Sequence, residues 1–240
     1  MIRIFVIDHR DADAQRPGEI ISPYMIYGFE RPGSEYADFC ALYEVWLGYT
    51  QLGTPPEIIG FFGYRKYLAP IPFDHGEDWI KPAHAPDWYQ CSKEDFDEYR
   101  QMMAEFDGSD IKRLLAQYDI LQAPPFPVDN LFNDFTRSRS RHDSHLLWDA
   151  ACAYFANVHP ANKIYPYLFI TRWSVFDRMM REMEPLRLEL HGHTVGADST
   201  NEEYIKRPMA YVMERVYSLW LENSGLSIRE VPLLHCWEMS

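Results

Sequence analysis

An apolar run at 58–62 continues directly into Tyr64, Arg65, Lys66 and Tyr67, and this stretch constrains the fold most strongly. Apolar residues broken only by a glycine are typical of a strand buried on both faces, as in a sheet enclosed by helices. In open α/β sheets, ligands bind beyond the carboxyl ends of the strands. The stretch therefore predicts a buried strand whose polar tip faces a ligand.

The side chains at this tip favour an anionic ligand. The guanidinium of Arg65 offers a planar fork of donors that suits phosphate or carboxylate, and Lys66 adds a point charge. Tyr64 and Tyr67 provide flat faces on which a base or a sugar can stack. The alternative is a solvated strand end with two ordinary surface cations, and spacing alone does not separate the two hypotheses.

A strand and a helix precede this stretch in the order of a βαβ unit. The apolar run at 2–7 ends in His9 and Arg10, so it predicts a first buried strand with its own polar tip. Helical spacing covers 35–49, and the strand at 57–68 follows. Two strands joined by a helix are expected to lie parallel in one sheet.

The remaining elements extend the same alternation of strands and helices. Strands are predicted at 118–123, 165–171 and 228–234, and helices at 92–107, 110–117, 142–157, 172–186 and 207–223. Loops are predicted at 70–87 and 191–203. No internal repeat or low-complexity linker divides the chain. We therefore expect a single α/β domain over residues 1–240, with a mostly parallel central sheet flanked by helices.

Composition excludes several classes of partner. The formal net charge is -13, which disfavours nucleic acid and anionic membranes because both need a basic face. Aromatic residues make up 15% of the chain, a share typical of proteins that grip flat or sugar-like ligands. The 4 cysteines form no CxxC pair, and no run approaches the ~20 apolar residues of a membrane span. We therefore expect a cytoplasmic protein with reduced thiols.

Acidic and histidine side chains offer alternative metal-binding hypotheses. Asp11 and Asp13 have the chemistry of ligands for a hard cation, but Pro17 and Gly18 follow closely and favour a solvated loop. His145 and Asp149 share one face of a predicted helix, without a third ligand at a diagnostic spacing. We expect His145 to be a surface or pocket residue rather than a zinc ligand.

A basic segment follows the third predicted strand. Arg137, Arg139 and Arg141 alternate with serines, an arrangement that could close over a diphosphate. A mobile, solvated basic segment is the alternative, and the sequence favours it.

Several segments, in order along the chain, resemble a family of bacterial capsular and exopolysaccharide glycosyltransferases that is often described only as a domain of unknown function. The most specific likeness is at 60–68, which resembles the family's GLxHYRRYF strand end. The amino-terminal half also matches the opening strand at 5–10 and the ALYxxW helix at Ala41, Leu42, Tyr43 and Trp46, with Asp38 where the family has Glu. The rest matches a DII strand at 119–121, an NMFIMxxxxFD segment at 168–170 with Phe176 and Asp177, and a final helix motif at Arg207, Glu214 and Arg215.

This resemblance implies a GT-A-like α/β fold and a nucleotide-sugar donor of the UDP-sugar class, with galactofuranose transfer in some members. Many GT-A enzymes place a metal-binding DxD where this chain reads GYRK, without a paired carboxylate. Arg65 and Lys66 could neutralise a leaving diphosphate in place of Mg²⁺ or Mn²⁺, so we expect no metal. Two positions depart from the family pattern, because Gly63 replaces a His and Tyr167 replaces an Asn.

Each candidate residue has an expected role. Glu214 is the candidate catalytic base because it follows the last long loop and matches the family's ER pair, while Arg215 is expected on another helix face. We expect the donor diphosphate to contact His9, Arg10, Tyr64, Arg65, Lys66 and Arg207. We expect the acceptor site or its surrounding pocket to contain Asp38, Tyr67, His145 and Tyr167.

The favoured function is sugar transfer from a nucleotide sugar to a glycan or lipid-linked acceptor in surface-polysaccharide synthesis, at the inner membrane only through the acceptor. One alternative is a nucleotide- or carbohydrate-binding protein that kept the fold but lost catalysis, as the departures at Gly63 and Tyr167 suggest. In that case Glu214 would be a structural ion-pair partner of a cation such as Arg65 or Arg207. A metal hydrolase is a weaker alternative because ligand spacing is lacking at His142, His145, His191 and His193.

Overall fold

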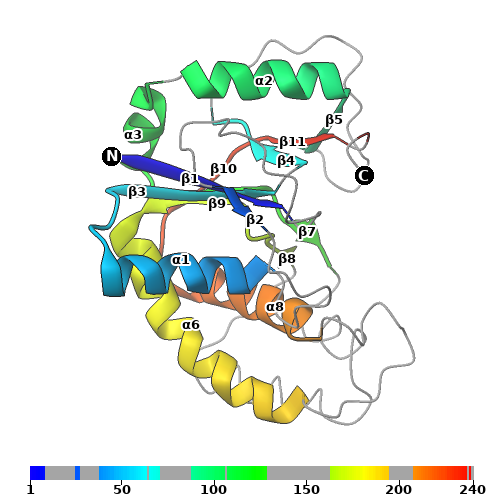
Figure 1. Cartoon of the computed structure of the whole chain (residues 1–240). Helices are drawn as coiled ribbons and strands as arrows, with labels where there is room; N and C mark the ends of the chain where they lie inside the picture. Colours follow the sequence, from blue (N-terminus) through cyan, green and yellow to red (C-terminus); the bar gives the residue numbers. More distant parts are fainter. Residues whose placement is uncertain are drawn as a thin grey trace.

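The strand, helix and second strand predicted near the amino terminus form a parallel unit. β1 (Ile2–Asp8) pairs with β3 (Ile58–Gly63), in a register that runs from Ile2 opposite Ile58 to Ile7 opposite Gly63. α1 (Asp38–Leu52) connects them. This arrangement confirms the βαβ prediction for the first quarter of the chain (Figure 1).

The computed structural model describes a defined subset of the chain: residues 1–8, 25–27, 38–63, 65–70, 88–105, 107–128, 163–194, 208–236 and 238. The other strands are β2 (Met25–Tyr27), β4 (Lys66–Leu68), β5 (Trp88–Cys91), β6 (Ile120–Gln122), β7 (Phe126–Pro127), β8 (Lys163–Ile164), β9 (Phe169–Arg172), β10 (Ile228–Glu230) and β11 (Leu233–Cys236). The other helices are α2 (Lys93–Glu105), α3 (Ser109–Leu115), α6 (Trp173–Thr194) and α8 (Pro208–Asn223).

One large sheet runs through the described part of the chain. Its strand order is β10-β6-β9-β3-β4-β11-β5, with β1 beside β3 and β2 beside β1, while β7 and β8 form a separate pair. β9 lies antiparallel between β3 and β6, and β4 is antiparallel to both β3 and β11. The α/β class with a helix-flanked sheet is confirmed. The sheet is mixed, since β4 folds back on β3 through a tight turn and β9 runs antiparallel between β3 and β6, while the other described strands of the sheet share one direction.

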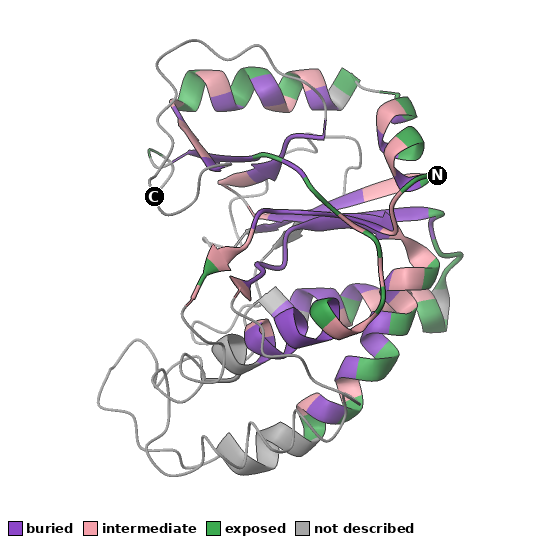
Figure 2. Cartoon of the chain, turned by 180° about the vertical axis from the view of Figure 1, so that it is seen from behind, coloured by how far each residue is buried: buried purple, intermediate pink, exposed green. Residues whose placement is uncertain are grey.

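Alternating side chains place a core on each face of the sheet. On β1 and β3, Phe5 and Phe61 face the side covered by α1, α6 and α8, while Ile4 and Phe62 face the side of α2 and α3. All four side chains are buried, and the central strands are enclosed from both sides (Figure 2). The continuous apolar runs of these strands are explained by this two-sided burial.

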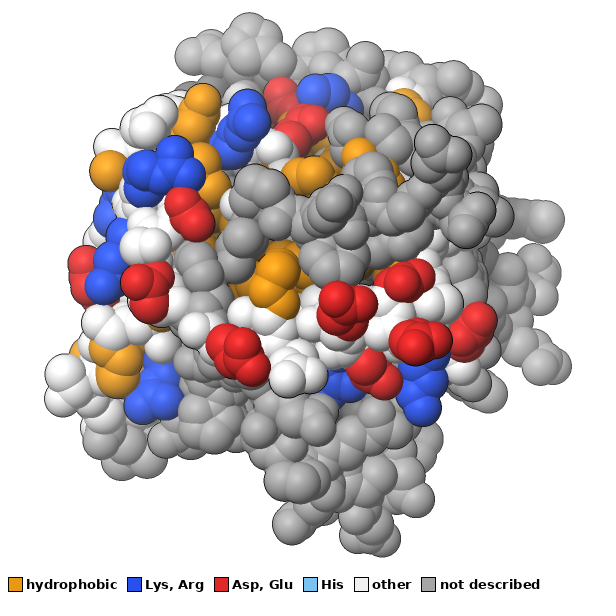
Figure 3. Space-filling model, turned by 90° about the horizontal axis from the view of Figure 1, so that it is seen from above, with side chains coloured by type: hydrophobic (Ala, Val, Ile, Leu, Met, Phe, Trp, Pro, Cys, Tyr) orange, Lys and Arg blue, Asp and Glu red, His pale blue; other side chains and the backbone are white. Residues whose placement is uncertain are grey.

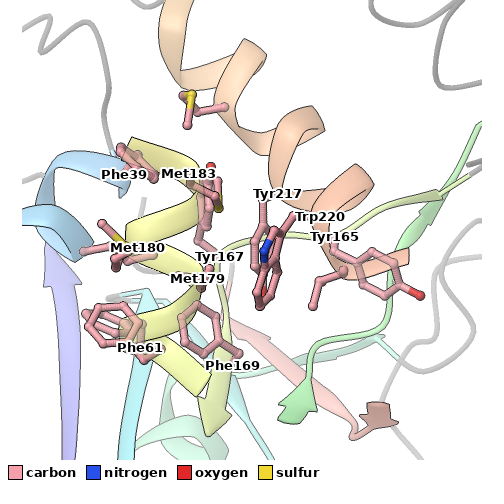
Figure 4. Packing of buried hydrophobic residues seen from close by; sticks show 14 of the residues in the cluster. Phe39, Phe61, Tyr165, Tyr167, Phe169, Met179, Met180, Met183, Tyr217 and Trp220 are labelled. Carbon is pink, nitrogen blue, oxygen red and sulfur yellow. The ribbon is translucent and has the colours of Figure 1, made fainter. Parts of the chain in front are cut away.

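The face of the sheet covered by α1, α6 and α8 carries a core of aromatic and methionine side chains. α6 contributes Met179, Met180 and Met183, which lie against rings from the sheet and from α8 (Figure 4). Tyr217 on α8 stacks near Phe169 on β9, with ring centroids 5.8 Å apart. The methionines therefore serve core packing, as their helical spacing suggests.

Two predicted strands differ from the structure for identifiable reasons. The stretch 57–68 is a hairpin of β3 and β4 rather than one strand, since Gly63 pairs with Lys66 across a tight turn. The predicted strand 228–234 is two strands, because Pro232 has no N–H for the ladder and the halves pair with different neighbours. β5 was not predicted.

α6 also continues beyond its predicted end at residue 186. The backbone remains helical to Thr194, so the predicted loop 191–203 begins later. Arg187 donates two 2.6 Å hydrogen bonds to Glu184, and its guanidinium lies 5.6 Å from the centroid of the Tyr43 ring. These contacts support the helix beyond Pro185, where the local sequence suggested an end.

Candidate functional site

The carboxyl ends of several strands meet at one edge of the sheet. β1, β2 and β3 run parallel, and β6 has the same direction because β9 is antiparallel to both β3 and β6. β11 also shares this direction, since β4 is antiparallel to both β3 and β11. This edge is where open α/β sheets bind ligands.

The cationic tip predicted from the sequence lies at this edge. Gly63 ends β3 and pairs with Lys66 at the start of β4, so Arg65 occupies the turn between them. Both cationic side chains are partly exposed. The predicted location of Arg65 and Lys66 is therefore confirmed, although the supporting element is a hairpin turn.

The carboxyl-terminal strand holds this hairpin in place. The backbone N–H of Cys236 donates a 3.0 Å hydrogen bond to the carbonyl of Arg65. His235 lies opposite Lys66 in the antiparallel pairing of β11 with β4, and opposite Gln90 in the parallel pairing with β5. The position of the two cations thus depends on a strand that lies 171 residues further along the sequence.

His235 is a site residue that sequence reasoning missed. It lies one residue beyond the predicted strand 228–234, yet it is only 3% exposed. Burial, together with the neighbouring Lys66 and Arg65 cations, lowers the pKa of His235 to about 3, so the imidazole is neutral at physiological pH. The apolar run at 231–236, which continues past His235 to Cys236, was the available signal.

A buried tryptophan forms the support beneath Lys66. The Nζ of Lys66 lies 5.4 Å from the ring centroid of Trp88, and the His235 ring meets the same indole edge-on at 6.2 Å. Trp88 Nε1 donates a 3.0 Å hydrogen bond to the carbonyl of Pro124, just after β6. Phe126 packs on the indole at a centroid distance of 4.3 Å. These contacts join the edge strand β5 to the segment that leaves β6.

The two tyrosines predicted to line the acceptor site are core residues in this structure. Tyr67 is 1% exposed and stacks on Phe96 of α2 at 4.7 Å. Tyr167 is 4% exposed, and its ring centroid lies 4.8 Å from that of Tyr217. Both residues are labelled in Figure 4. Their packing explains why large aromatic residues occupy these positions. A role in acceptor binding stays a prediction for both.

The candidate base Glu214 lies beside a buried arginine. Arg215 Nη1 is 3.4 Å from Glu214 Oε2, so the two side chains are in contact although they leave α8 at adjacent positions. The backbone of Glu214 also accepts a 2.8 Å hydrogen bond from Ser218, whose hydroxyl accepts one from the N–H of Tyr165. α8 is thereby fixed to the segment that leads into β9.

Other predicted site residues lie outside the described residues. These are His9, Arg10, Tyr64, His145 and Arg207, together with Asp11, Asp13, Arg137, Arg139, Arg141 and His142. Asp38 begins α1, and His191 and His193 lie in the last turn of α6. For these three residues the structure describes the backbone and not the side chain. Their predicted roles are unchanged.

Neither a metal-ligand cluster nor a membrane-spanning helix occurs in the described part of the chain. Within the described ranges, no three or more His, Cys, Asp or Glu side chains are grouped to hold a metal ion. The same ranges contain no helix that is both long and apolar enough to cross a bilayer.

α2 turns Glu94, Asp97 and Glu98 to solvent, and acidic side chains stand out on the face seen from above (Figure 3).

The architecture defines a class of fold: a GT-A-like α/β fold with a curled central sheet flanked by helices. A solved structure with this arrangement is the apo form of WbbM, a bifunctional glycosyltransferase, matched with a TM-score of 0.66 at 15% sequence identity. The match covers 98% of this chain and 45% of the WbbM chain, so the protein spans less than half of WbbM. No family model and no curated protein sequence matches the chain.

Proposed function

We propose that the protein is a glycosyltransferase that moves a sugar from a nucleotide-sugar donor, favoured as a UDP-sugar, to a glycan or lipid-linked acceptor in surface-polysaccharide synthesis. The observation that carries this proposal is the Arg65–Lys66 hairpin at the carboxyl edge of the sheet. It lies where α/β folds bind ligands, within a fold shared with a glycosyltransferase over nearly the whole chain. The acceptor would bring the protein to the cytoplasmic face of the inner membrane.

The hairpin is suited to an anionic donor. Arg65 can hold two phosphate oxygens with its planar fork, and Lys66 adds a second positive charge. Negative charge grows on the diphosphate as the bond to the sugar breaks, so fixed cations there stabilise the transition state more than the bound donor. The backbone hydrogen bond from the N–H of Cys236 to the carbonyl of Arg65 supplies the fixed geometry that such stabilisation requires.

Glu214 is proposed to remove the proton from the acceptor hydroxyl. General-base assistance of this kind contributes about 10²- to 10⁴-fold in rate. The side chain of Glu214 is 29% exposed and therefore reachable from solvent. Its fixed neighbour Arg215 supports a defined orientation of the carboxylate.

The same contact motivates a second candidate, a nucleotide- or carbohydrate-binding protein without catalysis. A carboxylate 3.4 Å from a buried guanidinium can be a structural ion pair rather than a base. In that case the fold and the cationic hairpin would still bind the donor. Turnover of the donor distinguishes the two candidates.

Nucleotide binding and donor turnover test the proposal. The melting temperature should rise with UDP or a UDP-sugar, in EDTA as well as with Mn²⁺, because the two cations take the metal's place. Release of UDP from a UDP-sugar in the presence of a glycan acceptor should follow. If no nucleotide or nucleotide sugar changes the melting temperature, the proposal is wrong. Binding without any release of UDP would favour the second candidate, and activity that requires Mn²⁺ would refute the metal-free mechanism.

A further inference from the structure

Two glycines in β3 have different structural reasons for being glycine. At Gly60, a Cβ atom would lie 3.0 Å from Ile170 Cγ1, 3.1 Å from the Phe169 carbonyl and 3.3 Å from Ile4 Cγ1. Because β1 and β9 approach this closely on either side, a side chain at Gly60 would be overpacked. The fold itself therefore explains Gly60.

Gly63, three residues later, has no such explanation. Its φ lies outside the left-handed region, so the backbone conformation does not require glycine. A Cβ there would meet Lys66 Cβ at 3.6 Å, Leu168 Cδ2 at 3.9 Å and the Lys66 carbonyl at 4.0 Å, all ordinary contacts. The packing of the described residues would accept a side chain. Glycine in a strand also costs stability relative to alanine.

The location of Gly63 suggests what the missing side chain makes room for. Gly63 is partly exposed, ends β3 at the ligand-binding edge, and pairs directly with Lys66. Glycine within a strand often marks a place where a ligand or another backbone comes close. For Gly60 the close neighbour is the protein itself. No described part of the protein approaches Gly63 as closely as β1 and β9 approach Gly60.

We propose that the backbone of Gly63 is a specificity-determining contact of the donor site, packed against a sugar ring attached to the diphosphate. This inference rests on the proposed function, since it takes the diphosphate to be held by Arg65 and Lys66. The cations hold the charged group, and the adjacent ring, either the ribose or the transferred sugar, lies over Gly63. A methyl group at this position fits the protein but occupies the space of the ring.

Three substitutions to alanine separate this role from a structural one. Gly63→Ala should keep or slightly raise the melting temperature, because alanine restricts the unfolded chain and meets no clash. Gly60→Ala should lower it by several degrees, because its Cβ would be overpacked. Gly48→Ala on α1, where no described atom lies within 4 Å of the new Cβ, is the control expected to leave binding unchanged.

Calorimetric titrations with UDP and with UDP-glucose then test the proposal. Gly63→Ala should weaken binding about 5- to 100-fold, the range expected for overpacking by one methyl group. A loss for both ligands places the ribose at Gly63, and a loss for UDP-glucose alone places the transferred sugar there. If Gly63→Ala binds both ligands as tightly as the wild type, the inference is overturned while the proposed function stands. If the wild type binds neither UDP nor any nucleotide sugar, both are overturned.

Discussion

The indole Nε1 of Trp46 on α1 donates a 2.8 Å hydrogen bond to Asp177 on α6. The other carboxylate oxygen accepts a 2.9 Å bond from Arg181 in the next turn of α6. One turn further, Glu182 repeats this arrangement by accepting from the indole of Trp220 on α8, at 2.7 Å, and from Arg178. Two carboxylates on α6 thus bind the helices on either side of it.

Removing the Trp46 hydrogen bond should destabilise the fold. Trp46→Phe keeps an aromatic ring but loses the donor, and hydrogen bonds to charged groups contribute about 1.5–3 kcal/mol. We expect a loss of about 1.5 kcal/mol in urea unfolding, because Asp177 retains its bond to Arg181. Glu98→Gln, on the exposed face of α2, is the control. Equal midpoints for Trp46→Phe and the wild type would show that the bond contributes little.

Asp119 should make stability depend on acid pH. Hydrogen bonds from the backbone and hydroxyl of Ser227, with Arg172 nearby, lower the pKa of Asp119 despite partial burial. Because the folded pKa is below the unfolded value of about 3.9, the stabilisation is present above that value and is lost as the pH falls below it. Asp119→Asn should therefore cost about 1–3 kcal/mol at pH 7 and progressively less below about pH 4.

Urea midpoints of wild type and Asp119→Asn, measured from pH 7 to pH 3, test this expectation. Asp110→Asn removes an ion pair with Arg113, whose side chain is 67% exposed, and should cost less than about 1 kcal/mol. A difference between wild type and Asp119→Asn that stays constant down to pH 3 would contradict the proposed titration.

Arg65→Ala should weaken binding of a nucleoside diphosphate by about 1.5–3 kcal/mol, the range for hydrogen bonds to charged groups. The fold should survive, because Arg65 contributes its backbone carbonyl to the hairpin and this group is unchanged. Arg113→Ala on α3 removes an exposed arginine and is the matched control. Calorimetric titration with UDP measures both variants. Equal UDP affinity for Arg65→Ala and wild type would remove Arg65 from the donor site.

Glu214→Gln should reduce sugar transfer about 10²- to 10⁴-fold while donor affinity and melting temperature stay close to wild type. The substitution keeps the size of the side chain and removes the proton acceptor. Steady-state release of UDP, read beside a melting curve, separates the two hypotheses for this residue. A large drop in melting temperature would instead identify the pair with Arg215 as structural. Near wild-type turnover would exclude Glu214 as the base.

Local sequence patterns determined much of the fold. The apolar run of β3, the helical spacing of α2 and α8, and the order of β1, α1 and β3 were all predicted from periodicity. Ser92, the first residue of the predicted helix 92–107, caps α2 because its Oγ accepts a 3.1 Å hydrogen bond from the N–H of Asp95. Such features depend on residues within one or two turns, so the sequence alone is sufficient.

The candidate site likewise has features that local sequence predicts and features that only long-range pairing sets. The position of Arg65 and Lys66 at a strand end followed from the apolar run before them, and the structure confirms it. The approach of His235 to Lys66, and of Trp88 to Pro124, depends on pairing between segments tens to hundreds of residues apart. No periodicity carries that information.

Tertiary structure alone decided strand direction, the depth of burial and the pKa of His235. β9 could have joined the sheet in either direction, because alternation specifies the faces of a strand and not its neighbours. His235 lies beyond the predicted strand 228–234, and only its pairing in β11 buries it beside two cations. Arg65 and Lys66 were identified from the sequence. The contacts around them and the charge state of His235 are set by long-range packing, which local residue preferences do not encode.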